Sequence, residues 1–224
     1  MTWDWATAAI VLCCLAGVYR YERSRCRRAR AALFSECLDL FDAYRVTQDG
    51  AAYPVLVGTY RGVEVRLEAI VDDLAWRKLP SLWLKTTIFT SHAYRGVFDL
   101  LMRPRGAEFY SPSAHLEHHL PLPADWPRDA LLCTDDPAAM PPLSVLSDHI
   151  AVFADPRMKE MVITPRGVRL VRQIRQAKRA HYAVLRQAEF EQKALERDVL
   201  AALLQAALAI GCDLSHGASL SKVA

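Results

Sequence analysis

The N-terminal segment constrains this chain more than any other part of its sequence. Residues 5–19 (WATAAIVLCCLAGVY) carry no charged side chain, and extending the run back to Met1 adds only Asp4. A helix rises about 1.5 Å per residue and needs about 20 residues, with about 17 as a lower limit, to cross a hydrocarbon core of about 30 Å. Residues 1–21 therefore just suffice as a transmembrane helix if Asp4 lies among the headgroups. Aromatic side chains stand where the two interfacial belts are expected: Trp3, Trp5, Tyr19 and Tyr21.

The charges beside this run predict its orientation. No Lys or Arg precedes it, whereas six arginines follow: Arg20, Arg23, Arg25, Arg27, Arg28 and Arg30. The positive-inside rule then predicts an N-terminus outside and a C-terminal domain in the cytoplasm. A cleaved signal peptide carries its positive charge before the apolar stretch, so the order is reversed here. A retained anchor is the prediction, with a cleaved signal and a buried helix of a soluble fold as alternatives. The arginines also allow contact with anionic lipid, although setting the topology accounts for them.

The rest of the chain has the composition of a globular protein, with 24% charged and 52% hydrophobic residues. We expect a transmembrane anchor at 1–21, a basic juxtamembrane and stalk helix at 22–48, one cytoplasmic α+β domain at 49–212 and a flexible tail at 213–224. The stalk helix is predicted from apolar side chains at helical spacing: Leu33, Phe34, Cys37, Leu38, Phe41 and Tyr44.

The middle of the chain is rich in strand patterns. Two hairpins are predicted, each turning at an Arg-Gly pair: 53–60 with 63–71 around Arg61-Gly62, and 159–164 with 168–174 around Arg166-Gly167. In the run 63–71 apolar and charged side chains alternate, as in a half-buried strand. Further strands are predicted at 82–90, 97–103, 129–134 and 180–185, with one helical turn within 72–79 and a short helix at 143–153. Strand runs with helices at the ends indicate an α+β fold on an antiparallel sheet.

A C-terminal helix is predicted at 190–210, with Gly211 as its stop. Its uncharged part, 199–210, has about 12 residues and is too short to cross a bilayer. One alternative stays open, because the apolar positions of 168–210 also fit a single long helix.

The residues best suited to bind a metal are three closely spaced histidines and six cysteines. His115 and His119 in the segment HLEHH are four apart, a spacing that zinc sites use on a helix. However, Leu116 stands where a zinc protease has its glutamate, Glu117 comes one residue late, and prolines flank the segment, so a solvated loop that includes His118 is expected. The six cysteines are too scattered for a disulfide framework or a metal pair, which predicts free thiols: Cys13, Cys14, Cys26, Cys37, Cys133 and Cys212.

Acid–base candidates are Asp135 and Asp136, with Asp148 and His149 further along. The acidic N-cap of a short helix explains Asp136 more simply, because Pro137 follows it. The sequence contains no Gly-x-Ser-x-Gly nucleophile motif and no glycine-rich phosphate loop. We therefore predict no catalytic residue, no cofactor and no metal ligand.

One basic run stands out: Arg166, Arg169, Arg172, Arg175, Lys178, Arg179 and Arg186. A solvated face is the expectation, and contact with anionic lipid headgroups is the alternative. Nucleic acid is disfavoured because few aromatic residues interleave with the run.

The segments GTYRGVEVRLEAIVDDLAWRKLPSLWL and MKEMVITPRGVRLVRQ, together with the anchor, resemble a group of uncharacterised single-pass membrane proteins of bacteria. The resemblance implies an N-terminal helix before an α+β domain of unknown role in a bacterial inner membrane, and it brings no catalytic residues. The leading hypothesis is a non-enzymatic, membrane-tethered interaction or scaffold module for a protein partner. The alternative is an enzyme or ligand-binding domain with its site in the proline-rich segment 104–142, with Asp135, His118 and His119.

Overall fold

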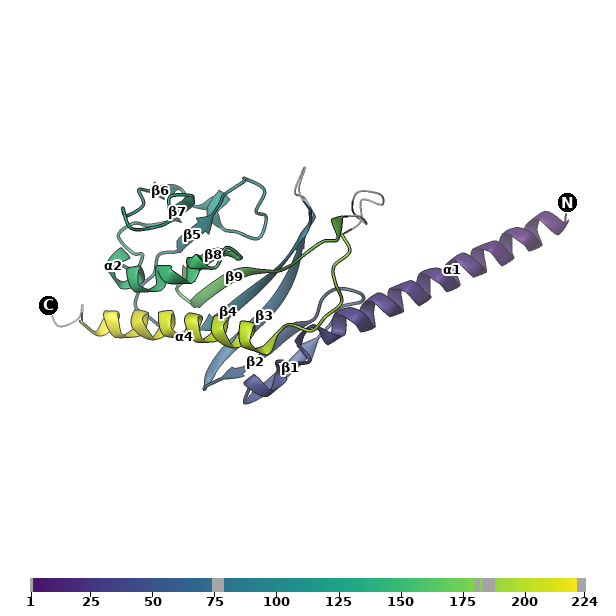
Figure 1. The fold of residues 1–224 in the computed structure, drawn as a ribbon, viewed down its shortest axis with the longest axis horizontal. Coiled ribbons are helices and arrows are strands. Elements are labelled where there is room, and N and C mark those ends of the chain that lie inside the picture. The colour runs from purple at the N-terminus through teal and green to yellow at the C-terminus, as the bar shows by residue number, and fades with distance from the viewer. Residues whose placement is uncertain (1, 74–78, 180–181, 183–187, 221–224) are drawn as a thin grey trace.

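The computed structural model describes residues 2–73, 79–179, 182 and 188–220. They form a long N-terminal helix, a nine-stranded antiparallel sheet and a C-terminal helix, which confirms the predicted α+β class (Figure 1). The strands are β1 (Ala43–Thr47), β2 (Val55–Tyr60), β3 (Val63–Asp72), β4 (Ser81–Phe89), β5 (Phe98–Met102), β6 (His118–Leu120), β7 (Ala130–Thr134), β8 (Met158–Thr164) and β9 (Gly167–Gln176). The helices are α1 (Thr2–Ala31), η1 (Ala32–Phe34), η2 (Leu38–Leu40), η3 (Ser113–His115), α2 (Leu143–Leu146), η4 (Ser147–Ala154) and α4 (Arg197–Leu220).

The strand order of the sheet is β1-β2-β3-β4-β9-β8-β5-β7-β6. Strands β1 to β4 follow one another as a meander, and β5 to β8 make up the other half. Strand β9 returns to the middle, where it pairs with β4 on one side and β8 on the other. Both predicted hairpins are present, since β2 pairs with β3 and β8 pairs with β9.

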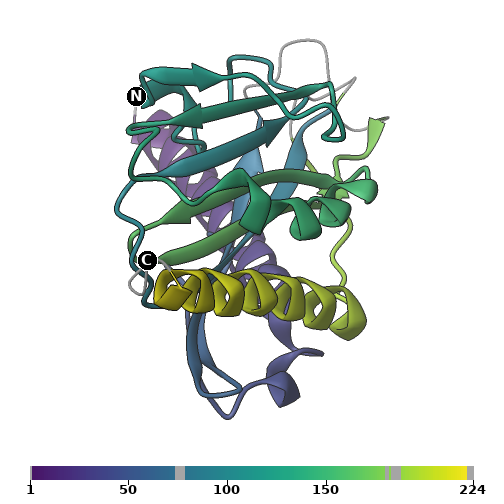
Figure 2. The same ribbon diagram turned by 90° about the vertical axis from the view of Figure 1, so that its left-hand side faces the viewer.

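Helix α4 covers one face of the sheet. It packs against β4 and β9 (Figure 2), and its buried side chains recur at helical spacing: Leu200, Leu203, Leu204, Ala207, Ile210 and Leu214. They pack into the main core with Leu84, Ile88 and Leu170. Alternate side chains of a strand point to opposite faces, so Trp83 lies on the other face, where it packs with Tyr110 and Val171 in a second, smaller cluster.

The predicted stalk helix is wrong beyond Ala31. Helix α1 continues from the apolar run without a break, but the single-turn 3-10 helices η1 and η2 follow it, and β1 occupies 43–47. The apolar residues that mimic a helical stripe are buried in the core of the sheet domain instead: Leu33, Phe34, Cys37 and Phe41. Residues 43–47 (AYRVT) pair with β2 over their whole length, and this pairing overrides the weak helical periodicity.

The boundaries of the C-terminal helix also differ from the prediction. Helix α4 begins at Arg197 rather than near 190 and continues through Leu220, so Gly211 does not end it. Gly211 instead lies where the helix approaches β4, because an added Cβ would come within 2.9 Å of Thr90 and 3.0 Å of Ile88. A glycine at this position allows the close packing of helix on sheet.

The remaining predictions in the middle of the chain are mostly confirmed. The strands expected at 82–90, 97–103 and 129–134 correspond to β4, β5 and β7, and the helix expected at 143–153 is split into α2 and η4. Strand β9 excludes the single long helix over 168–210. The strand predicted at 180–185 and the helical turn predicted within 72–79 fall largely outside the described residues.

We predict that the hairpin turn of β9 tolerates no side chain. Gly167 has φ of 144°, and an added Cβ would clash with the carbonyl oxygen of Ile88. We expect Gly167→Ala to lower the free energy of unfolding by about 3 kcal/mol, from backbone strain and steric overlap together. Urea unfolding measures the effect. The control is Gly62→Ala, where φ is 78° with no atom nearby, for which backbone strain alone predicts about 1 kcal/mol. Equal losses in the two variants would contradict the prediction.

Candidate functional site

The histidine segment is divided between a 3-10 helix and an edge strand. His115 ends η3, whereas His118 and His119 belong to the short edge strand β6 and are exposed. The helix needed to bring His115 and His119 onto one face is therefore not formed. Within the described ranges, no three His, Cys, Asp or Glu side chains are grouped closely enough to hold a metal ion.

The acid–base candidates serve separate structural contacts. Asp135 accepts a hydrogen bond from the Val97 amide (2.6 Å), and Asp136 accepts one from the Ala138 amide (2.9 Å). Asp136 therefore caps the turn at 137–140 rather than a helix. His149 bonds to Asp213 (2.8 Å) and so connects η4 to α4.

The basic run is divided among different contacts. Arg172 forms an ion pair with Asp155 (2.7 Å) and Lys178 with Glu189 (2.9 Å). Arg175 donates to the carbonyl of Ala194 at 3.1 Å, Arg166 is exposed in the hairpin turn, and Arg186 lies outside the described residues. Arg172, Arg175 and Lys178 of this run therefore make contacts within the fold.

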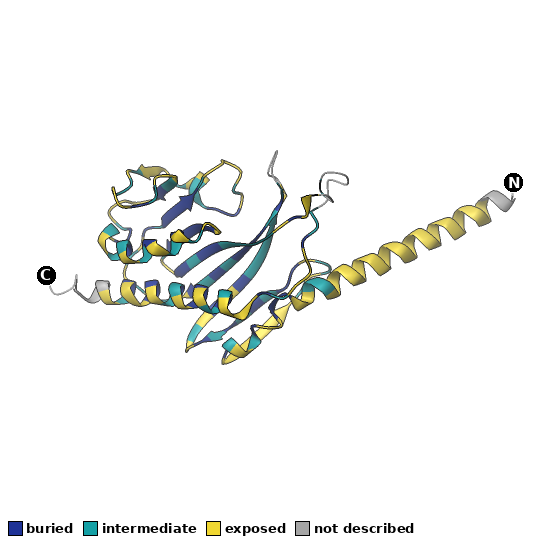
Figure 3. Ribbon diagram, in the orientation of Figure 1, coloured by how far each residue is buried: buried dark blue, intermediate teal, exposed yellow. Residues whose placement is uncertain are grey.

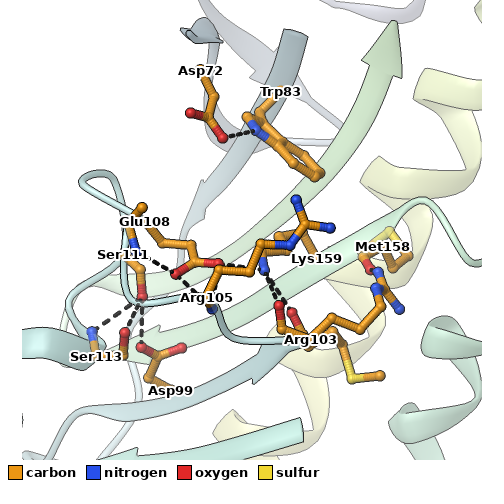
Figure 4. Close-up of polar contacts among 12 residues, drawn as sticks. Asp72, Trp83, Asp99, Arg103, Arg105, Glu108, Ser111, Ser113, Met158 and Lys159 are labelled. Atoms are coloured by element: carbon orange, nitrogen blue, oxygen red, sulfur yellow. Dashed lines mark hydrogen bonds and ion pairs between the residues drawn. The ribbon is translucent and has the colours of Figure 1, made fainter. Parts of the chain in front are cut away.

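The structure instead shows a polar cleft on the face of the sheet opposite α4 (Figure 4). It has a volume of about 440 Å³, within the range of small-molecule sites. One wall is formed by the ends of β3, β4 and β9, and the other by the segment 103–110. Six of the lining residues characterise it: Asp72, Trp83, Arg105, Glu108, Tyr110 and Gln173.

The aromatic wall of the cleft is fixed by contacts with its neighbours. The rings of Trp83 and Tyr110 pack with centroids 5.9 Å apart, and the Trp83 indole N–H donates to Asp72 at 3.3 Å. The Tyr110 hydroxyl and the second Asp72 carboxylate oxygen are buried without a hydrogen-bond partner among the described residues. A buried polar atom without a partner costs about 1–3 kcal/mol, so these atoms mark a place where a bound group would be stabilised.

Lys159 lies beneath the cleft at a bulge in the sheet. The register between β8 and β9 shifts between Met158 and Glu160, which leaves Lys159 outside the regular ladder. Its ammonium donates to the carbonyls of Met102 (2.7 Å) and Arg103 (2.9 Å) and to the Glu108 carboxylate (2.8 Å). All three N–H donors are thereby used. Burial nevertheless lowers the pKa of Lys159 below its usual value.

Glu108 organises the loop that forms the second wall. Besides Lys159, its carboxylate accepts hydrogen bonds from the backbone amides of Arg105 (3.1 Å) and Ala107 (3.1 Å). Burial by itself raises the pKa of Glu108, but the bond to Lys159, its positive charge and the Arg105 amide outweigh burial and lower the pKa. A single carboxylate thus holds the loop to β8.

A pair of buried carboxyl groups lies on the same face of the sheet. Asp99 in β5 and Glu160 in β8 are both fully buried. Burial raises the pKa of both groups, and repulsion by Glu160 raises that of Asp99 further. The Ser111 hydroxyl, which donates to Asp99 at 3.2 Å, and the Arg169 guanidinium oppose these shifts. We infer that the pair retains a proton near neutral pH.

Sequence reasoning missed this face of the sheet. Asp99 stands in VFDLLMR, and Lys159 and Glu160 stand in MKEMVIT, where charged residues interrupt otherwise apolar strands. Charged side chains inside buried strands require partners. These three residues were therefore the signal in the sequence for a polar network on this face. The partners Glu108 and Ser111 belong to a proline-rich loop whose path the sequence does not reveal.

The comparisons with known proteins assign no family to this chain. No protein-family model matches it, and no curated protein matches it either. Among solved structures, it is similar to the crystal structure of the mycobacterial trehalose monomycolate transport factor A, TtfA. The TM-score is 0.38 with 12% sequence identity, over 85% of this chain and 93% of that chain. At this low TM-score the likeness supports no inference about function.

We predict that the carboxyl pair makes the stability depend on pH. Because the pKa values of Asp99 and Glu160 are raised on folding, the folded chain binds more protons than the unfolded chain above about pH 4. Stability should therefore fall as pH rises from about 4 towards neutrality, by up to about 1.4 kcal/mol per pH unit for each extra proton. Asp99→Asn should flatten this decline, since the amide keeps the bond to Ser111 and can donate to Glu160.

Urea unfolding at a series of pH values tests this prediction. The control is Asp125→Asn, because Asp125 is exposed and its replacement should leave the slope unchanged. A slope that is the same in Asp99→Asn as in the unaltered chain would show that the pair does not take up the proton.

Proposed function

We propose that α1 anchors this chain in a membrane and that the remaining domain is a non-enzymatic interaction module in the cytoplasm. The observation that carries the proposal is the exposure of α1. Every residue from 5 to 28 is exposed (Figure 3), including Ile10 at 63%, Leu12 at 68% and Leu15 at 62%. An apolar helix exposed on all sides is stable in lipid and unfavourable in water.

The length of α1 supports the same assignment. Its 30 residues extend about 45 Å, and the helix projects away from the sheet domain (Figure 1). Residues 1–21 would span the hydrocarbon core, and the arginine-rich remainder would lead into the cytoplasm.

The end of α1 is attached to the domain. Gln48 donates to the Arg27 carbonyl (3.0 Å), and Arg30 donates to the Ala51 carbonyl (2.6 Å). The Arg30 guanidinium also lies 4.9 Å from the centre of the Tyr53 ring. These contacts would hold the domain close to the bilayer surface in a fixed orientation.

Helix α4 is the competing candidate for a membrane span. In the part of the chain that the structure describes, Arg197–His216 is the one helix that meets the criteria of length and hydropathy for crossing a membrane, and α1 does not meet them. However, 39% of that window is buried, and its buried side chains form the core against β4 and β9. The core helix of a soluble domain satisfies the same criteria, so α1 is the proposed anchor.

A non-enzymatic role is supported by the position of the ionisable groups. Asp99 and Glu160 have the strongly raised pKa values typical of catalytic acids, but both are fully buried. The ammonium of Lys159 is bound by three acceptors. These groups are therefore not free to act on a substrate in the cleft. Turnover by the purified chain would refute this part of the proposal.

We predict that the C-terminus lies in the cytoplasm. A C-terminal reporter that fluoresces only in the cytoplasm should be active, and the fusion should stay in the membrane fraction after alkaline extraction, because the six arginines follow the apolar run. A second fusion, to an enzyme active only outside the cytoplasm, serves as the control. Activity of that enzyme alone would reverse the proposed orientation.

We also predict that charge placed in the middle of α1 prevents anchoring. Each arginine near the bilayer centre costs about 3 kcal/mol, so Leu12→Arg with Leu15→Arg should cost about 6 kcal/mol and move the chain to the soluble or degraded fraction. The control is Tyr44→Arg with Val46→Arg, which changes two exposed apolar residues of β1 and should leave the chain in the membrane. Equal membrane retention of both variants would exclude α1 as the anchor.

A further inference from the structure

Two arginines line the polar cleft, and a third lies in the shallow depression that adjoins it. Arg103 and Arg105 line the cleft and also an adjoining shallow depression of about 520 Å³, to which Arg128 contributes. The guanidinium of Arg103 donates to the carbonyls of Pro156 (3.0 Å) and Met158 (2.5 Å), so its position is fixed without a carboxylate. Within the described ranges, none of these three arginines forms an ion pair.

The positive charge of the cleft and the depression is not balanced by the protein. Glu108 is already bonded to Lys159, and Asp129 is the carboxylate that lines the depression beside Arg128. Asp72 lies on the opposite wall of the cleft, bonded to the Trp83 indole. Over the lining of the cleft and the depression together, four cationic side chains stand against three carboxylates, which leaves a surplus of one positive charge. Arg105 and Arg103 lie close enough to Lys159 for their positive charges to lower its pKa.

Two other residues that line the cleft have hydrogen-bonding atoms without partners among the residues that the structure describes. The Tyr110 hydroxyl is buried and unpaired within the described part of the chain, as is one carboxylate oxygen of Asp72. The side chain of Tyr110 itself is only 9% exposed. A ligand with hydroxyl groups next to an anionic group would satisfy both regions at once.

We propose that this cleft binds a phosphate monoester with a polar, hydroxyl-bearing body. The dianionic phosphate would lie where the cleft meets the depression, against Arg105, which lines both, and Arg128, which lines the depression, because guanidinium groups bind phosphate oxygens in a bidentate manner. The body of the ligand would extend towards Tyr110 and Asp72. The inference concerns the cleft alone and does not require that α1 lies in a membrane.

Binding is tested by isothermal titration of the full-length chain in a neutral detergent, with inorganic phosphate and glycerol 3-phosphate as probes. Glycerol 3-phosphate should bind more tightly, because its hydroxyls reach the deeper groups. Arg105→Ala with Arg128→Ala should weaken both probes by at least about tenfold. The control is Arg95→Ala with Arg166→Ala, which removes two exposed arginines elsewhere and should change the affinity by less than about twofold.

Tyr110→Phe separates the two parts of the site. It should weaken glycerol 3-phosphate several-fold and leave inorganic phosphate unchanged, since the hydroxyl is expected to meet the body of the ligand. The proposal is overturned if neither probe binds the unaltered chain at millimolar concentration, or if the two double variants lose affinity equally.

A phosphate ester can be a soluble molecule or the headgroup of a lipid, and a competition experiment distinguishes the two sources. Phosphatidic acid, which carries a phosphate monoester, is added to the detergent micelles during the titration, with phosphatidylcholine as the control lipid. Loss of glycerol 3-phosphate binding with phosphatidic acid alone identifies a lipid headgroup as the ligand. Unchanged binding identifies a soluble ester.

Discussion

Strand β9 is hydrogen-bonded to β4 on one side and to β8 on the other, and the two halves of the sheet are joined through these pairings. Without β9, the meander β1–β4 and the group β5–β8 would each have an open edge in the middle of the molecule, with unpaired backbone groups. Helix α4 packs across β4 and β9, so it covers the junction itself. The main core therefore depends on a strand that is the last to be added along the chain.

The polar face is a consequence of the same junction. The ladders on both sides of β9 contain an irregularity, one at Leu82/Trp83 and one at Met158/Glu160. Bulges bend a strand and redirect its side chains. Lys159 is redirected in this way onto the carbonyls at the end of β5, where Glu108 meets it and fixes the loop 103–110. The cleft lies between two attachments of this loop, the ion pair of Glu108 with Lys159 and the packing of Tyr110 on Trp83.

The two proposals concern separate parts of the molecule. The exposed apolar surface of α1 calls for a lipid environment, whereas the surplus of arginines at the cleft calls for an anion. A cytoplasmic domain tethered near the bilayer would meet both soluble phosphate esters and lipid headgroups. The fixed contacts of Arg30 and Gln48 at the end of α1 would then determine which side of the domain faces the membrane.

The sequence by itself determined the elements whose signals are local. The uncharged run and its arginines, the Arg-Gly hairpins and the alternation in β3 all follow from side-chain chemistry and turn geometry within a few residues. Only the tertiary structure decided where the remaining elements lie. Residues 43–47 form a strand because they pair with the free edge of β2. Gly211 is a point of close packing because α4 lies against the end of β4 there. Asp99, Glu160 and Lys159 were visible as charges, but their partners come from a distant loop, and contacts between segments far apart in the chain leave no local pattern to read.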